Sequence, residues 1–278
     1  MQAITCAVLI ALIAASAASP TRLDSSVVAA AHAFAANQTG NSVIGGHTVD
    51  ITKYPWTVSI CHKSGGGCTF EAAGSIIGDR WILTSGGALG KDSTSYRVTV
   101  GSNNYDKNGD QSILAEEIYY GGFSYDEDIA LIRLSGPIKF GSRAQAIRLP
   151  AIESDTDNTS AMFAGWGHTS DSWFASMSST LNEAQMYIGD GGVCQSRYGS
   201  KWNGRSMLCV GGNGPTTCHW DVGGPLMKKR SDGYWYLYGL AGNNDYYATG
   251  CSYPTIFTRI DYFCSWIERI TRADVSCQ

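Results

Sequence analysis

Short runs of β-forming residues, separated by turn residues, recur along most of this chain. Each run is rich in Val, Ile, Leu, Tyr or Trp and is bounded by Gly, Ser, Asn, Asp or Pro. Twelve runs are predicted to be strands: WTVSI, GSIIG, RWILT, YRVTV, ILAEEIYY, DIALIRL, AMFAGWG, EAQMYI, SMLCVGG, GPLMKK, YWYLYGLAG and TIFTRI. So many short strands with few helices between them predict an all-β fold whose sheets close or fold on themselves.

One segment near the C-terminus has helical spacing instead. In DYFCSWIERITRA, residues 261–273, the apolar side chains of Phe263, Ile267 and Ile270 fall on one face. Asp261 stands where an N-cap residue is expected. A single amphipathic helix is therefore predicted after the last strand.

The first 42 residues differ in composition from the rest. Ala3 to Ala18 is apolar and ends in small residues, which is typical of a secretory signal peptide, and the run is too short to span a bilayer. Residues 19–42 are rich in Ala, Ser, Thr and Asn, which indicates a pro-segment. We therefore expect a signal peptide at 1–18, a pro-segment at 19–42 and one domain at 43–278, secreted and without a membrane partner.

The cysteine count agrees with secretion, because disulfides persist in oxidising compartments. Of nine cysteines, Cys6 falls in the predicted signal peptide, and an even set of eight remains. No cysteine or histidine cluster has zinc spacing, so neither a metal nor another cofactor is expected. The eight cysteines are Cys61, Cys68, Cys194, Cys209, Cys218, Cys251, Cys264 and Cys277.

The net charge of −4 argues against nucleic acid as a partner. Asn37 and Asn158 each begin a possible glycosylation sequence, NQT and NTS. About 235 residues after the pro-segment suffice for a monomer with its own core.

Eight strings occur in an order that carries a family resemblance: VIGG, GSII, WILT, DIALIRL, GWG, MLCVGG, CHWDVGGPL and TIFTRI. In this order they resemble the chymotrypsin/trypsin-like serine proteases, over about residues 43 to 270. The resemblance implies two six-stranded antiparallel β-barrels, at 43 to about 150 and about 160 to 260. It also implies a C-terminal helix and a substrate cleft between the barrels.

The resemblance places the catalytic triad at three positions, of which one is retained. Asp128, in DIALIRL, matches the aspartate, whereas Gly87 stands for the histidine and Val222 for the serine. Loss of the serine or the histidine alone costs roughly 10⁶ in turnover in a comparable enzyme. The chain is therefore expected to be a protease homologue without catalytic activity.

None of the five histidines is expected to act as a substitute general base. His219 lies close in sequence to Val222, but an exposed loop histidine is the expected interpretation. The others are expected to lie remote from the cleft: His32, His47, His62 and His168.

The substrate pocket also departs from the family. Trp220 stands where glycine lets a backbone N–H reach the oxyanion, and it is expected to perturb or cover that donor. Thr216 at the pocket base and Thr255 at the wall are expected to narrow or plug it. Gly242 to Asn244 replaces the Ser-Trp-Gly string that pairs with the substrate backbone.

Structural features of the family are retained. Asp221 matches the residue that pairs with the new N-terminus, which would be Val43 here. The preceding Ser42 is not the Lys or Arg that a trypsin-like activator requires, so removal of the pro-segment stays open.

Ala72 and Ala88 replace both partners of one family disulfide. Cys194–Cys209 and Cys218–Cys251 match family bridges. Elimination leaves Cys61–Cys68 and Cys264–Cys277, which lie outside the common pattern.

The substitutions at the triad, together with the unusual cysteines, resemble the inactivated protease paralogues of the scabies mite, relatives of the group 3 mite allergens. That group implies binding to host complement components and inhibition of complement. The alternatives are a cofactor or a decoy in another protease cascade, and residual hydrolysis is strongly disfavoured.

Two surfaces are candidates for binding. The aromatic run YWYLYG with Asp245 to Tyr247 is one, although alternation of strand residues between core and solvent explains it as well. Lys228 to Arg230 is the other, and a solvated hairpin tip is its simpler explanation.

Overall fold

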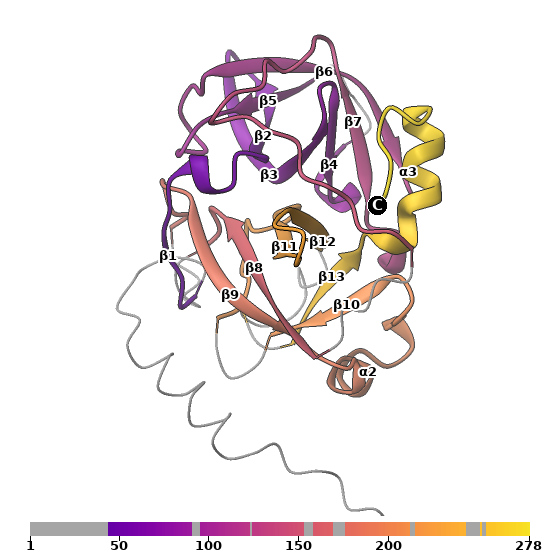
Figure 1. Cartoon of the computed structure of the whole chain (residues 1–278). Coiled ribbons are helices and arrows are strands. Elements are labelled where there is room, and N and C mark those ends of the chain that lie inside the picture. The colour runs from indigo at the N-terminus through magenta and orange to yellow at the C-terminus, as the bar shows by residue number, and fades with distance from the viewer. Residues whose placement is uncertain are drawn as a thin grey trace, which may run out of the picture.

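The computed structural model describes residues 44–90, 95–122, 124–152, 158–168, 176–211, 215–242, 251 and 254–278. Several expectations concern residues outside this part of the chain: the signal peptide at 1–18, the pro-segment at 19–42, Asn37, Val43, and residues 243–247. Within it, two bodies of strands lie one above the other (Figure 1).

The first body is a closed antiparallel barrel with strand order β2-β3-β4-β7-β6-β5. Antiparallel pairs of consecutive strands are β2–β3, β3–β4, β5–β6 and β6–β7, while β4–β7 and β2–β5 pairings close the barrel. The strands are β2 Thr57–Ser64, β3 Gly67–Gly78, β4 Trp81–Thr84, β5 Tyr96–Val100, β6 Gln111–Tyr120 and β7 Ala130–Leu134.

The second body closes in the same manner, in the order β9-β10-β13-β12-β11-β8, with β8 pairing back onto β9. All of its pairings are antiparallel. Its strands are β8 Thr159–Gly165, β9 Asn182–Ile188, β10 Met207–Val210, β11 Pro225–Lys229, β12 Trp235–Ala241 and β13 Thr255–Arg259. The predicted all-β class with two six-stranded barrels and a C-terminal helix is confirmed, and each of the twelve predicted runs contains a strand.

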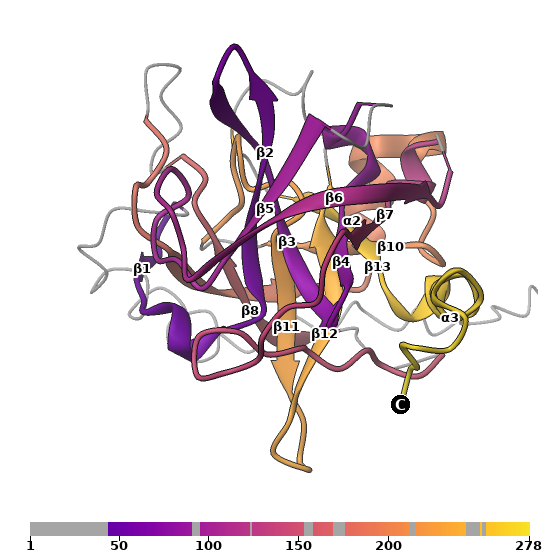
Figure 2. The same cartoon turned by 90° about the horizontal axis from the view of Figure 1, so that it is seen from above.

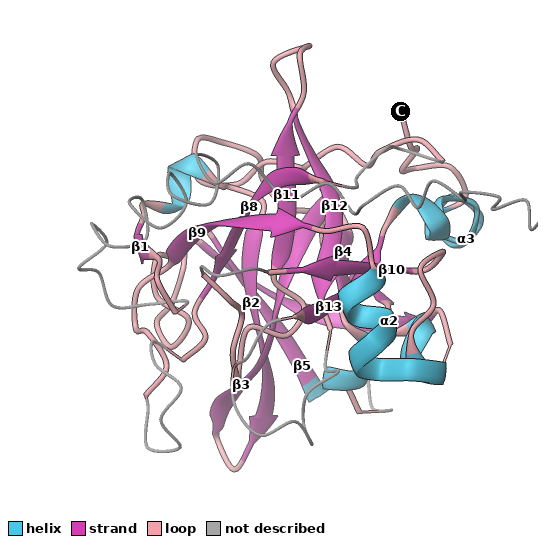
Figure 3. Ribbon diagram, turned by 90° about the horizontal axis from the view of Figure 1, so that it is seen from below, coloured by secondary structure: helices cyan, strands magenta, loops and turns pink. Residues whose placement is uncertain are grey.

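Two elements were not predicted. β1, His47–Thr48, is a two-residue strand that pairs with β9. Helix α2, Gly192–Tyr198, spans seven residues, which is too short for a periodic signal. Figure 3 shows α2, α3 and the short helical turns at the margins of the strands. The remaining single turns are Ile51–Lys53, Gly86–Ala88, Tyr125–Glu127, Gly199–Lys201 and Asp261–Phe263.

The predicted C-terminal helix is present as α3, Cys264–Thr271, but its predicted cap is wrong. Phe263 occupies the N-cap position. Asp261 lies in the preceding turn, where its buried carboxylate accepts a hydrogen bond of 2.8 Å from Nε of Arg259. A buried carboxylate needs a charged or hydrogen-bonding partner, and Asp261 finds it in the Arg259 guanidinium rather than at the start of α3. No helix in the described part of the chain is both long and apolar enough to cross a membrane.

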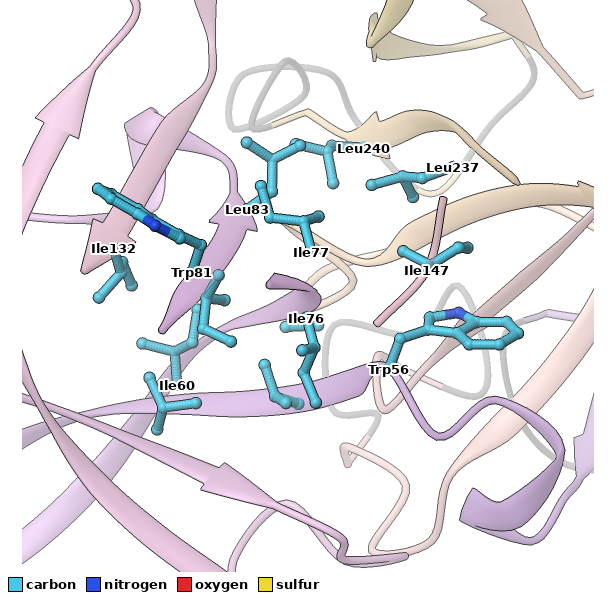
Figure 4. Close-up of a cluster of buried hydrophobic side chains, with 14 of the residues drawn as sticks. Trp56, Ile60, Ile76, Ile77, Trp81, Leu83, Ile132, Ile147, Leu237 and Leu240 are labelled. Carbon is cyan, nitrogen blue, oxygen red and sulfur yellow. The ribbon is translucent and has the colours of Figure 1, made fainter. Parts of the chain in front are cut away.

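One hydrophobic core joins the two barrels. Ile76 and Leu83 from the first barrel pack into the same cluster as Leu237 and Leu240 from the second (Figure 4). Ile267 of α3 is fully buried in this cluster, which holds the C-terminal helix against the first barrel. Each such side chain contributes roughly 1.5–3 kcal/mol through removal of its surface from water.

A buried carboxylate ties β1 and the turn after it to the second barrel. Glu183 in β9 accepts hydrogen bonds from Nζ of Lys53, at 2.6 Å, and from the hydroxyl of Tyr54, and His47 lies 2.7 Å away. Burial alone would raise the pKa of the Glu183 carboxyl, but the hydrogen bonds from Lys53 and Tyr54 hold it below its ordinary value. The ionised form is therefore the one that the fold requires.

Replacing Tyr54 by Phe tests this network. Tyr54 is fully buried, so the Tyr54→Phe variant leaves the Glu183 carboxylate with one donor fewer and without access to water. We expect a loss of about 1–3 kcal/mol in the free energy of unfolding, measured by urea titration. Tyr262→Phe, at a tyrosine on the surface, is the control and is expected to change nothing. Equal midpoints for the two variants would contradict the argument.

Candidate functional site

Three segments that carry the triad positions meet where the two barrels join. The N–H of Ala73 in β3 donates to the carbonyl of Val222, at 2.9 Å, across the junction. From the other side, the Thr258 hydroxyl in β13 donates to the backbone carbonyl of Asp128, at 2.8 Å. Gly87 joins the group because its N–H donates to the Asp128 carboxylate, at 2.7 Å. Gly87 therefore meets Asp128 directly, and Val222 lies at the same junction of the barrels. We call these three positions the junction site (Gly87, Asp128 and Val222).

The Asp128 carboxylate is buried, and groups of its own chain supply its donors. Besides the N–H of Gly87, the hydroxyl of Ser85 donates to the same oxygen, at 2.6 Å. A buried carboxylate without such donors would be strongly destabilising. Sequence reasoning missed Ser85. Its signal was a hydroxyl residue, two positions before Gly87, in a turn that otherwise holds glycine and alanine.

Gly87 and Val222 supply no reactive side-chain atoms to this site. Gly87 is exposed and lies in the single turn Gly86–Ala88. Val222 is half-buried and connects the barrels through its backbone carbonyl. The next residue must be glycine, because a Cβ on Gly223 would lie 2.2 Å from the carbonyl oxygen of Ala73.

Trp220 has a backbone conformation that favours glycine. Its φ is +72°, a left-handed conformation that bulky residues rarely adopt. The indole is 41% exposed and makes an edge-on contact with Phe70, with ring centroids 6.5 Å apart. The tryptophan therefore lies over the first barrel beside the junction site. Whether it covers the oxyanion donor stays a prediction.

The two threonines of the predicted pocket are both buried. The Thr216 hydroxyl donates to the carbonyl of Thr217, at 3.3 Å, and the Thr255 hydroxyl donates to the carbonyl of Val210, at 3.2 Å. Thr216 also pairs with Ile44, since its N–H donates to the Ile44 carbonyl at 3.3 Å. Gly242 is half-buried at the end of β12, and the remainder of its string lies outside the described residues. Narrowing of the pocket stays a prediction.

Asp221 is fully buried in a backbone cradle. Its carboxylate accepts hydrogen bonds from the N–H groups of Cys218 and Gly167, each at 2.9 Å. Burial raises the pKa of this carboxyl to about 7, although both hydrogen bonds lower it. Gly165 and Gly167 make room for it, because a Cβ on either would come within 2.5 Å of the carboxylate. Its expected partner, the amino group of Val43, lies outside the described residues.

The expectation that His168 is remote from this region is wrong. Its ring packs edge-on against His219, with centroids 5.6 Å apart, and its N–H donates to the His219 carbonyl at 3.0 Å. Burial, and secondly the neighbouring His219, lower the pKa of the His168 imidazole. His219 is half-buried rather than exposed. Strand β8 and the loop before Asp221 converge here, which the sequence spacing did not reveal.

The eight cysteines form the four bridges that the resemblance and elimination predicted: Cys61–Cys68, Cys194–Cys209, Cys218–Cys251 and Cys264–Cys277. Ala72 and Ala88, at the positions of the lost bridge, pack on the central core instead. Four disulfides are typical of an extracellular protein. In the part of the chain that the structure describes, no three His, Cys, Asp or Glu side chains gather as metal ligands.

The two candidate surfaces are mostly engaged within the fold. In YWYLYG only Tyr234 is strongly exposed, at 52%, since the rest of the strand contributes to the core. Lys228 donates to the Thr159 hydroxyl, and Arg230 stacks on Tyr236, which leaves Lys229 exposed. Asn158 is exposed, although its side chain accepts a hydrogen bond from Tyr187.

Removal of the Ser85 hydroxyl tests its role beside Asp128. The Ser85→Ala variant removes one of the hydrogen bonds to the buried Asp128 carboxylate. We therefore expect a loss of about 1–3 kcal/mol in the free energy of unfolding. Ser75→Ala is the matched control, because Ser75 is also fully buried but its hydroxyl has no hydrogen-bond partner. Chemical denaturation that ranks Ser75→Ala as the more damaging change would refute the assignment.

The raised pKa of Asp221 predicts a dependence of stability on pH. Between about pH 4 and pH 7 the folded chain holds a proton on Asp221 that the unfolded chain releases. For a chain that retains residues 19–42, the free energy of unfolding should therefore fall by roughly 4 kcal/mol across this range and level off above it. Asp221→Asn should remove this component.

Denaturant midpoints measured at several pH values give the comparison. In a chain that begins at Val43, the free energy of unfolding should not decrease over this pH range, because an ammonium group beside Asp221 favours the ionised carboxylate. If wild type and Asp221→Asn keep the same pH profile, the carboxyl does not titrate as described.

Comparison with known proteins agrees with this geometry. The family model described as Trypsin matches residues 43–267. Chymotrypsin-like elastase family member 3A of Homo sapiens is 28% identical, over 87% of this chain and 93% of its own length. Trypsin iota of Drosophila melanogaster is 30% identical, over 83% and 89%. CLIP domain-containing serine protease B4 of Anopheles gambiae is 30% identical, over 83% and 71%. With two closed barrels that meet at Asp128 and Val222, this chain belongs to the trypsin-like serine protease family.

Proposed function

We propose that this chain is a secreted homologue of the trypsin-like proteases that does not hydrolyse peptide bonds and acts by binding other proteins. The observation that carries the proposal is the composition of the junction site. Acyl transfer in this family requires a nucleophile, a base and an orienting carboxylate in mutual contact. Here the carboxylate of Asp128 accepts a hydrogen bond from the backbone of Gly87, a residue with no side chain to take a proton. Val222 has no nucleophilic atom in its side chain.

Among the described residues, neither Ser85 nor His219 is placed as a substitute. Ser85 contacts Asp128, but it is fully buried and its hydroxyl donates to that carboxylate, so a substrate carbonyl has no approach to it. The ring of His219 packs edge-on against that of His168. The burial of Ser85 and its bond to Asp128 argue against a rebuilt catalytic pair at this place.

The proposed partners are complement components of a host. This part of the proposal rests on the resemblance to the inactivated mite paralogues and on the bridges Cys61–Cys68 and Cys264–Cys277, which lie outside the common family pattern. A cofactor or decoy in a different protease cascade is the alternative. A decoy would need an open substrate pocket, and the buried threonines Thr216 and Thr255 argue against it.

The absence of hydrolysis can be measured directly. We expect the secreted chain to cleave peptide substrates at least about 10⁵-fold more slowly than an active family member. A fluorophosphonate, which reacts with activated serines, should not label it. The Gly87→His/Val222→Ser variant, which supplies both missing groups, is the comparison. Labelling of the wild-type chain that Ser85→Ala abolishes would overturn the assignment.

The complement role is tested by a dose series in human serum that covers the classical, lectin and alternative routes. Wild type and the Gly87→His/Val222→Ser variant are expected to suppress lysis equally, because binding does not depend on the junction site. The reduced and alkylated chain is the control. No suppression in any route at micromolar dose would remove complement from the proposal and leave a protein-binding protease homologue with another partner.

A further inference from the structure

A hollow of about 400 Å³ lies at the hairpin between β2 and β3, far along the chain from the junction-site residues Asp128 and Val222. Figure 2 shows this hairpin projecting beyond the first barrel. Its lining consists of residues 63–68 of the hairpin and Arg97 of the neighbouring strand β5. We call it the hairpin groove.

Strand register places the two cations of the groove on one face. Cys61 of β2 is directly opposite Arg97 of β5, and Lys63 of β2 is directly opposite Cys68 of β3. Side chains that are opposite each other, or two residues apart on one strand, share a face of the sheet. Lys63 and Arg97 therefore lie on the same face as the Cys61–Cys68 disulfide.

Neither cation has a counter-ion within the described chain. No carboxylate lies within ion-pair distance of Lys63 or Arg97, and both side chains are half-buried. Five other basic residues each contact a carboxylate: Lys53, Arg133, Arg143, Arg148 and Arg259. Two neighbouring cations without a partner produce a local positive potential that attracts an anion.

The tip of the hairpin is open. Gly65 and Gly66 have φ values of +55° and +89° and form a two-residue turn, with Ser64 paired to Gly67. A Cβ on Gly65 or Gly66 would meet nothing within 4 Å, so the groove is accessible from this side. The Cys61–Cys68 bridge closes the loop across β2 and β3, which reduces the ordering cost of binding.

We propose that the hairpin groove binds the carboxylate side chains of an acidic peptide segment on a partner protein. Lys63 and Arg97 supply the charge, and the arginine fork can hold one carboxylate through two hydrogen bonds. A protein segment fits better than a sulfated polysaccharide, because a long polyanion requires an extended row of cations, whereas this groove has two in a chain of net charge −4.

The inference extends the proposed protein-binding function by naming a surface and the chemistry of its partner. The groove inference and the proposed complement role can fail separately, because peptide binding at the groove is measured with a purified peptide and without complement. The probe is a short fluorescein-labelled peptide of Glu and Gly, titrated with the full secreted chain and followed by fluorescence anisotropy. A peptide with Gln in place of Glu is the negative probe, and a heparin-derived oligosaccharide is the competing ligand.

The expected result is saturable binding of the Glu peptide that weakens with added salt. Lys63→Glu/Arg97→Glu should weaken binding by roughly tenfold or more. Lys107→Glu/Lys229→Glu changes the net charge equally at two exposed positions and should leave binding unchanged. Lys63→Ala/Arg97→Ala repeats the test should the charge reversal disturb folding.

Three outcomes would overturn the inference. One is the absence of Glu-peptide binding, and another is equal weakening by the two charge-reversal variants, which would indicate a long-range charge effect. The third is binding of the oligosaccharide at Lys63 and Arg97 without binding of the peptide, which would assign the groove to a different class of partner.

Discussion

The packing of the two barrels on each other is the interaction on which the rest of this structure depends. A closed barrel satisfies its backbone hydrogen bonds without exposed edges, but each barrel alone would leave apolar side chains at its surface. Ile76 and Leu83 from one barrel bury this surface against Leu237 and Leu240 from the other, and α3 adds Ile267. Gly87 and Val222 contribute backbone groups to the junction site, so a glycine and a valine there leave the core intact.

The two buried carboxylates near the junction show different ways of retaining a charge-bearing residue. The Asp128 carboxylate accepts hydrogen bonds from the side-chain hydroxyl of Ser85 and from the backbone N–H of Gly87. Asp221 has backbone N–H donors, and its raised pKa shows that these do not offset its burial near neutral pH. The first carboxylate is therefore stabilised by its own neighbours. The second is in an environment that an additional cation would stabilise.

Binding and catalysis place different demands on such a scaffold. Catalysis requires several groups from different strands to be held in contact, whereas binding can use one surface loop on a rigid frame. The hairpin groove meets the demands of binding, because Lys63 and Arg97 come from the adjacent strands β2 and β5, and the Cys61–Cys68 disulfide ties β2 to β3 beside them. Its chemistry does not depend on the atoms present at Gly87 or Val222.

Hydrophobic periodicity was enough to place the twelve main strands and the last helix, because each signal is local. Ordered motifs predicted that Gly87, Asp128 and Val222 share one site, and the structure joins Gly87 to Asp128 through a hydrogen bond. Periodicity could not predict β1 or α2, which are too short to repeat a pattern. The residue type and position of Asp261 predicted a capping role, whereas in the fold Asp261 is buried beside Arg259 and forms an ion pair with it.

The sequence by itself determined which atoms this protein has: no imidazole at position 87, no hydroxyl at position 222, and eight cysteines outside the predicted signal peptide. Only the tertiary structure decided which of the remaining groups meet. Ser85 reaches Asp128, His168 packs on His219, and Lys63 shares a face with Arg97. The members of each pair are separated along the chain, and barrel closure and strand register, which depend on the whole fold, bring them together.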